Sequence, residues 1–143
     1  MKKILAATDG SPSSDRAVAF AADCAAAHGA ELLIFTVSDD LVSESLESMA
    51  RAERATVSEM LEAEAKALLS LARTIANRHG VPSAKTQSET GDPASVLLDA
   101  ARAEHADLIV VGKRGRGRLR GLLLGSLSQK LASLASCPVA IVP

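Results

Sequence analysis

Residues 108–128 read LIVVGKRGRGRLRGLLLGSLS, and this stretch decides the fold. The apolar run 108–111 predicts a buried strand, and residues 126–135 have the apolar spacing of an amphipathic helix. The loop between them contains five glycines and five basic residues. Glycine lets a backbone approach an anion closely, and the unpaired N–H groups of a helix start point toward it. A strand, a basic glycine loop and a helix start in this order predict a phosphate-binding site.

Outward from this stretch, further strands are predicted at residues 3–8, 31–37, 84–88 and 139–142. Helices are predicted at 12–28 and 93–103, because Ser11-Pro12 and Asp92-Pro93 each read as a cap followed by a first-turn proline. Helical spacing also recurs within residues 41–79. The alternation of strands and helices predicts a single α/β domain over residues 1–143, with an open, mostly parallel sheet covered by helices on both faces.

The predicted parallel sheet brings three segment ends to one side. Asp9-Gly10 follows the first strand, Val37-Ser38 ends the second, and Gly112 follows the fourth. In open parallel sheets, ligands bind outside the carboxyl ends of the strands, where the strand order reverses. We therefore expect the basic glycine loop to share a site with the ends of the first two strands.

Composition narrows the possible partners. The net charge is −1, yet five positive charges lie in the glycine loop, so the rest of the chain is acidic and a specific anion is favoured over a general polyanion. The chain has no Trp or Tyr, which disfavours nucleic-acid binding by base stacking. No segment approaches the roughly 20 apolar residues that span a bilayer. The two distant cysteines, Cys24 and Cys137, suggest core residues and a reducing compartment, so we expect a cytoplasmic protein.

The glycine spacing Gly112-x2-Gly115-x9-Gly125-Ser126 resembles the G-x2-G-x9-G-[ST] signature of nucleotide-binding universal stress proteins. The likeness extends to the opening KKILAATDGS, to ADLIVVG at 106–112 and to the closing helix and strand, and is weakest between about residues 41 and 80. The resemblance implies a Rossmann-like sheet with strand order 3-2-1-4-5. It also implies a homodimer formed through the last strand, 139–142, whose uncharged apolar sequence would otherwise be an exposed edge.

The resemblance further implies an ATP site. Gly115, Gly125 and Ser126 would bind the phosphates, and the Ser128 hydroxyl would also reach them. Val111 and Gly112 would lie under the ribose, and the remaining matched positions are Ala7, Thr8, Asp9, Val37 and Leu127. Asp9 has two interpretations that stay open: a ligand of a Mg²⁺ ion bridging the phosphates, or a hydrogen-bonding residue of the nucleotide site or the turn.

The loop is more basic than in many relatives of this type, since Lys113-Arg114 stands where many carry Ser-His. Its arginines, at 114, 116, 118 and 120, would contact phosphate, dock an acidic partner or point into water. The expected function is therefore an ATP-binding stress-response dimer that signals to a regulatory protein. The alternatives are a nucleotide-independent adaptor that docks an acidic protein through this loop, and a slow ATPase. No general base is visible among the matched residues, so binding is favoured over catalysis.

Overall fold

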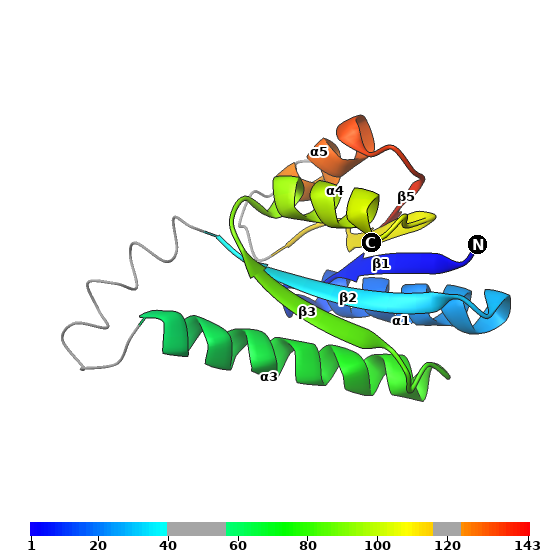
Figure 1. Ribbon diagram of the computed structural model, residues 1–143, viewed down its shortest axis with the longest axis horizontal. Helices are drawn as coiled ribbons and strands as arrows, with labels where there is room; N and C mark the ends of the chain where they lie inside the picture. The colour runs from blue at the N-terminus through cyan, green and yellow to red at the C-terminus, as the bar shows by residue number, and fades with distance from the viewer. Residues whose placement is uncertain (40–56, 116–123) are drawn as a thin grey trace.

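The structure is a computed structural model that describes residues 1–39, 57–115 and 124–143 (Figure 1). The helical spacing noted within residues 41–56 and the roles considered for Arg116, Arg118 and Arg120 concern residues outside this part. The strands are β1 (Lys3–Ala7), β2 (Glu31–Ser38), β3 (Lys85–Thr90), β4 (Leu108–Gly112) and β5 (Val139–Val142). The helices are α1 (Pro12–His28), α3 (Val57–Arg78), α4 (Pro93–Ala103) and α5 (Ser126–Leu134).

The five strands form one sheet in the order β3-β2-β1-β4-β5, and every pairing is parallel. This confirms the predicted fold class and strand order. Parallel strands point the same way, so the ends of β1, β2 and β4 lie along one edge of the sheet (Figure 1). The main difference in bounds is β3, which runs to Thr90 where the sequence predicted an end at residue 88.

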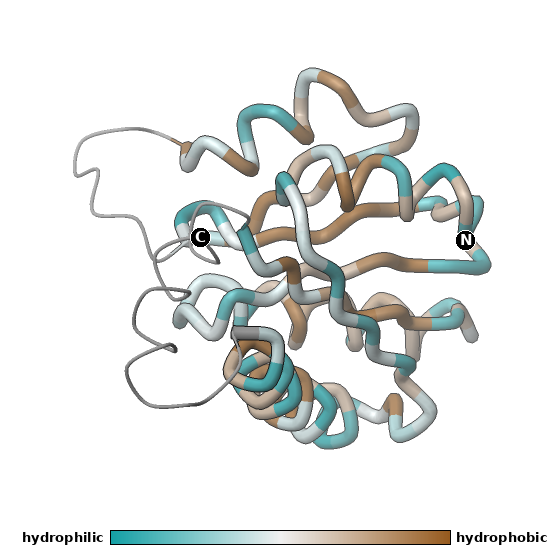
Figure 2. The backbone as a smooth tube through the Cα atoms, turned by 60° about the vertical axis from the view of Figure 1, so that its left-hand side comes forward, coloured by the Kyte–Doolittle hydropathy of each residue, from teal (hydrophilic) through white to brown (hydrophobic). Residues whose placement is uncertain are grey.

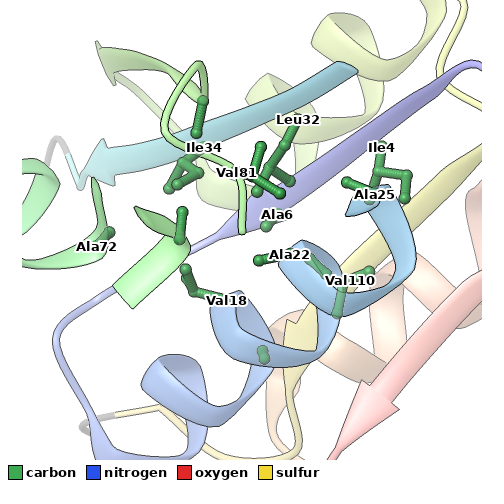
Figure 3. Packing of buried hydrophobic residues seen from close by; sticks show 14 of the residues in the cluster. Ile4, Ala6, Val18, Ala22, Ala25, Leu32, Ile34, Ala72, Val81 and Val110 are labelled. Carbon is green, nitrogen blue, oxygen red and sulfur yellow. The ribbon is translucent and has the colours of Figure 1, made fainter. Parts of the chain in front are cut away.

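Helices cover both faces of the sheet, α1 and α3 on one side and α4 and α5 on the other (Figure 1). Successive side chains of a strand point to opposite faces, so Ile4 packs in the core beneath α1 and α3 while Leu5 packs in the core beneath α4 and α5. Figure 2 shows the inner strands as the most hydrophobic part of the backbone, and Figure 3 shows the α1 and α3 core from close by. This double burial explains the continuous apolar runs of β1, β2 and β4.

The helix starts differ in how they are capped. The Ser11 side chain accepts a hydrogen bond from the Ser14 N–H at the start of α1, and the Asp92 side chain does the same for Ser95 at the start of α4. Helix α5 begins after Gly125, which has no side chain to offer, and it makes no side-chain cap bond. The first amides of α5 are therefore the exception among these helix starts.

The amino end of the sheet carries a cluster of charged residues. The Lys3 ammonium lies 2.6 Å from Glu104 and 3.5 Å from Glu31, and Lys85 lies 3.2 Å from Glu31. The hydrogen bond to Glu104 raises the pKa of Lys3, and the one from Lys85 lowers the pKa of Glu31. These residues line a hollow of about 610 Å³, which we call the amino-end hollow.

No helix in the described part of the chain is both long enough and apolar enough to cross a membrane.

Candidate functional site

A cavity of about 710 Å³ opens at the carboxyl ends of the strands, and we call it the carboxyl-end cavity. It is lined by β1, β2 and β4, by the segments that follow them and by the start of α5. All the positions that the sequence matched to a nucleotide site line it: Ala7, Thr8, Asp9, Val37, Val111, Gly112, Gly115, Gly125, Ser126, Leu127 and Ser128. Segments up to 121 residues apart in the chain thus meet in one place because the sheet is parallel.

The turn after β1 holds the Asp9 carboxylate against the glycine loop. Asp9 Oδ1 accepts a hydrogen bond from the Ser11 N–H at 2.9 Å, which closes the turn. A Cβ atom added at Gly115 would lie 2.5 Å from Asp9 Oδ2, so this carboxylate oxygen lies directly beside the glycine. Asp9 therefore has a turn-forming role in the structure, and its second oxygen faces the loop.

Buried hydroxyls brace the same turn from behind. Ser14 Oγ donates to the Ser11 carbonyl at 2.9 Å and lies 3.2 Å from Thr8 Oγ1. Since a hydroxyl has one proton, Thr8 donates in the second of these bonds. Thr8 Oγ1 in turn accepts from the Gly10 N–H at 3.2 Å. The hydroxyl of Thr8, a matched site residue, is thus used within the protein to fix the turn.

Gly112 is required by packing. A Cβ atom at this position would lie 2.6 Å from Ser13 Oγ, 2.8 Å from the Ser13 carbonyl carbon and 2.9 Å from the Ser14 nitrogen. Two of these are backbone atoms of α1, which cannot rotate away. The end of β4 and the start of α1 therefore touch, and this contact sets the distance between the β1 turn and the glycine loop.

The carbonyl of Lys113 joins the two ends of the glycine loop. It accepts a hydrogen bond from the Gly125 N–H at 2.8 Å and one from Ser128 Oγ at 3.2 Å. Ser128 Oγ also lies 3.0 Å from the Gly125 carbonyl, and Ser128 is 1% exposed. The Gly125 amide and the Ser128 hydroxyl, which the resemblance assigns to phosphate, are thus already engaged with the Lys113 and Gly125 carbonyls.

The amides that follow Gly125 have no such partner. The first bond along α5 runs from the Gln129 N–H to the Gly125 carbonyl at 3.0 Å. The N–H groups of Ser126 and Leu127 therefore have no protein acceptor among the described residues. Together with the positive end of the helix dipole, and with Lys113 and Arg114 on the cavity wall, they favour an anion here.

The lining contributed by β2, α3 and α4 includes several aliphatic side chains, of which sequence reasoning found only Val37. Helix α3 contributes Leu61, Ala65 and Leu68, and α4 contributes Pro93 and Leu97. The polar lining residues that were not predicted as binding residues are Ser14, Thr36, Ser38, Asp39, Glu64, Lys113, Arg114 and Gln129. An amphipathic pattern in α3 was visible in the sequence, but not which part of its apolar face lies beyond the sheet. The cavity therefore has an anion-binding side and an apolar side.

A metal ion at this site would need ligands beyond the protein. The described residues contain no group of three or more His, Cys, Asp or Glu side chains placed to hold an ion. Mg²⁺ commonly takes one or two carboxylates, with phosphate and water supplying the other ligands. The carboxylate of Asp9 beside the loop fits a Mg²⁺ ion of this kind. It does not fit an ion that needs three or more protein ligands.

Comparison with known proteins matches the whole chain. The model of the Universal stress protein family matches residues 1–143. A universal stress protein of Thermus aquaticus is 41% identical over 144 residues, covering 99% of this chain and 98% of that protein. A solved universal stress protein in complex with cAMP is 30% identical, with a TM-score of 0.75, over 99% of this chain and 96% of that one. The structure from Lactobacillus plantarum is 25% identical, with a TM-score of 0.81, over 99% and 97%.

Proposed function

The chain belongs to the universal stress protein family, and on this premise we propose that it binds an adenine nucleotide, ATP, in the carboxyl-end cavity. One observation carries the proposal: the start of α5, which has no side-chain cap, and a set of aliphatic side chains line the same cavity. A nucleotide has an anionic end and a flat apolar end, so it matches both sides. The 30% identical relative solved with cAMP supports an adenine nucleotide on this fold.

The phosphates bind at the start of α5, where the Ser126 and Leu127 amides point toward them and the Ser126 hydroxyl adds a donor. Gly115 keeps this approach open. The ribose lies over Val111 and Gly112, and the base extends past Ala7 toward Val37. In this arrangement the Ser128 hydroxyl bonds the Lys113 and Gly125 carbonyls, and so supports the phosphate site without contacting the ligand.

Mg²⁺ enters this proposal with the nucleotide. Asp9 would hold the ion through its carboxylate, which lies beside the glycine loop and whose Oδ1 also accepts the Ser11 N–H. The ion would neutralise phosphate charge that would otherwise be repelled by the carboxylate. Asp9→Asn keeps the turn acceptor and removes the charge. We expect it to abolish the dependence of ATP affinity on Mg²⁺, measured by titration with and without EDTA. An unchanged Mg²⁺ dependence would remove Asp9 from this role.

The test of nucleotide binding uses a matched pair on α5. Gly125 has a φ of −71°, which any residue adopts, and a Cβ atom there would lie 3.3 Å from the Lys113 carbonyl. Gly125→Val should therefore fold while obstructing the phosphate side, and should weaken ATP binding at least about tenfold. Ala132→Val, on the exposed side of the same helix, is the control. If both variants bind ATP as the original chain does in calorimetry, the phosphates do not bind at this helix start.

The second part of the proposal is a homodimer through β5, which is an edge strand and only half-buried. The Pro138 carbonyl accepts a bond from Ile109 of β4 at 3.0 Å, and the Val142 carbonyl accepts one from Lys113, just after β4, at 2.6 Å. Alternate residues of β5 therefore face β4, and the N–H of Ile141 points to the open edge. Ile141→Pro removes that outward donor and is tolerated in an edge strand. We expect the molar mass in light scattering to fall from dimer to monomer. A dimer that survives this change would place the interface elsewhere.

We also propose that the protein is cytoplasmic. We propose further that a regulatory protein binds it differently depending on whether nucleotide is bound. Cys24 and Cys137 are both free thiols, as a reducing compartment allows. The matched residues supply binding groups, and Asp9 has a role in the turn and, in this proposal, in holding Mg²⁺, so the proposal is binding rather than turnover.

A further inference from the structure

Helix α3 is longer than the strands it covers. Its 22 residues span about 33 Å, whereas the 8 residues of β2 span about 26 Å and the 6 of β3 less. The helix is antiparallel to the strands, so it begins near their carboxyl ends. Figure 1 shows its first turns extending past the tips of β2 and β3. The beginning of α3 is therefore without sheet beneath it.

The apolar face of α3 continues into this overhang. Leu61, Ala65, Leu68, Ala72 and Ala76 follow one another at intervals of three or four residues, so they share one face of the helix. Ala72 and Ala76 are 1% and 0% exposed in the core against the sheet. Leu61, Ala65 and Leu68 line the carboxyl-end cavity instead. The same stripe thus packs on the sheet at one end and faces the cavity at the other.

The position of this stripe matches the length of a nucleotide. The cavity reaches from α5 and the end of β4, across β1, to the end of β2. Neighbouring strands are about 4.8 Å apart, so the ends of β2 and β4 are separated by about 10 Å. A phosphate at the start of α5 therefore places the base of the same molecule over β2. There, the cavity is lined by Val37, Leu97 and the α3 stripe, together with the polar side chains of Thr36, Ser38, Asp39 and Glu64.

We infer that Leu61, Ala65 and Leu68 of α3 form the wall that selects the base, and that they favour a purine over a pyrimidine by contact area. The inference rests on the proposed nucleotide function and adds the element that sets its specificity. The three side chains carry no hydrogen-bonding group, so they discriminate by shape and by buried apolar surface. A purine presents a larger flat surface than a pyrimidine and gains more from the same wall.

Two matched pairs on α3 test this inference. Ala65→Leu fills the compartment, whereas Ala67→Leu adds the same atoms on the exposed side. Leu68→Ala removes part of the wall, whereas Leu71→Ala removes the same atoms from a residue that is 63% exposed. We expect Ala65→Leu to weaken ATP binding about tenfold or more, and Leu68→Ala roughly 3- to 10-fold. The two control variants should bind ATP as the original chain does.

The ratio of ATP to CTP affinity separates base selection from a general structural effect. Damage to the fold would weaken both ligands equally, whereas loss of the wall in Leu68→Ala should weaken ATP more and reduce the ratio. If the original chain binds ATP and CTP equally, or if the ratio is unchanged in Leu68→Ala, the inference is wrong while the nucleotide proposal stands. If the original chain binds no nucleotide at millimolar concentration, both the inference and the nucleotide proposal are wrong. Should Ala65→Leu not fold, Leu68→Ala decides alone.

Discussion

The amino-end hollow and the carboxyl-end cavity have similar volumes, about 610 and 710 Å³, but their linings differ. In the amino-end hollow, Lys3 and Lys85 pair with Glu31 and Glu104, so the charges of these four residues satisfy one another. In the carboxyl-end cavity, a helix starts without a side-chain cap and the aliphatic stripe of α3 lines the wall. A ligand gains most where protein groups lack partners. Volume alone would not distinguish the two.

The largest effect should come from making the carboxyl end too crowded. Gly112→Ala places a Cβ atom within 2.9 Å of two backbone atoms of α1, so the helix must shift. We expect a loss of about 1–3 kcal/mol in the free energy of unfolding. Gly125→Ala, whose nearest contact would be 3.3 Å, should cost less. Urea denaturation measures both. Equal losses would mean that the contact between β4 and α1 does not set the shape of the cavity.

A smaller effect should follow from loosening the link between the loop ends. Ser128→Ala removes the hydroxyl that bonds the Lys113 and Gly125 carbonyls, and both carbonyls keep another donor. We expect a loss of about 1 kcal/mol in unfolding free energy. Ser133→Ala, an exposed position of the same helix, is the control. If the two variants are equally stable, the buried hydroxyl contributes nothing that the exposed one does not.

Ionisable residues at the amino end of the sheet should make the stability of the protein depend on pH. Hydrogen bonds from the Lys2 and Lys3 backbone lower the pKa of Asp107, and the one from Lys85 lowers that of Glu31. Their stabilisation is therefore present above the unfolded pKa of about 4 and is lost as the pH falls through the folded values. The raised pKa of Lys3 acts in the opposite sense, and its contribution is lost only as the pH rises above about 10. Asp107→Asn should flatten the decline of Tm below pH 4. A decline of unchanged slope would contradict this assignment.

The smallest effect should come from Glu31→Gln. The Lys3, Glu31 and Lys85 side chains are partly exposed, so water and salt screen their attraction. We expect a slight fall in Tm that disappears in high salt, and an ATP affinity equal to that of the original chain. A change in ATP affinity would show that the amino-end hollow and the nucleotide site are not independent.

Local signals in the sequence were enough for most of the fold. Ser11-Pro12 and Gly29 mark the ends of α1, where Gly29 has the left-handed φ of 63°. β3 was harder to place, because its residues are mostly exposed and polar and lack the apolar run of an inner strand. Its extension to Thr90 depends on pairing with β2, which no local pattern encodes.

The site was predicted in part, for a physical reason. Residues fixed by spacing, such as Gly112 and Ser126, could be read from the chain. The overhang of α3 depends on the relative lengths of a helix and two strands, so Leu61 and Leu68 could only be assigned to a helix. The hydrogen bond of the Gly125 amide could not be predicted from the sequence, because its acceptor is the Lys113 carbonyl at the other end of the loop.

A nucleotide that binds at the carboxyl end of the sheet should change the amide NMR shifts of the residues around it during an ATP titration. Binding at this end predicts changes at Val37, Gly112, Gly115, Ser126 and Leu127, with smaller ones at Leu68, and none at Glu31 or Lys85 in the amino-end hollow. Shifts centred on the amino-end hollow, or no shifts at millimolar ATP, would contradict it.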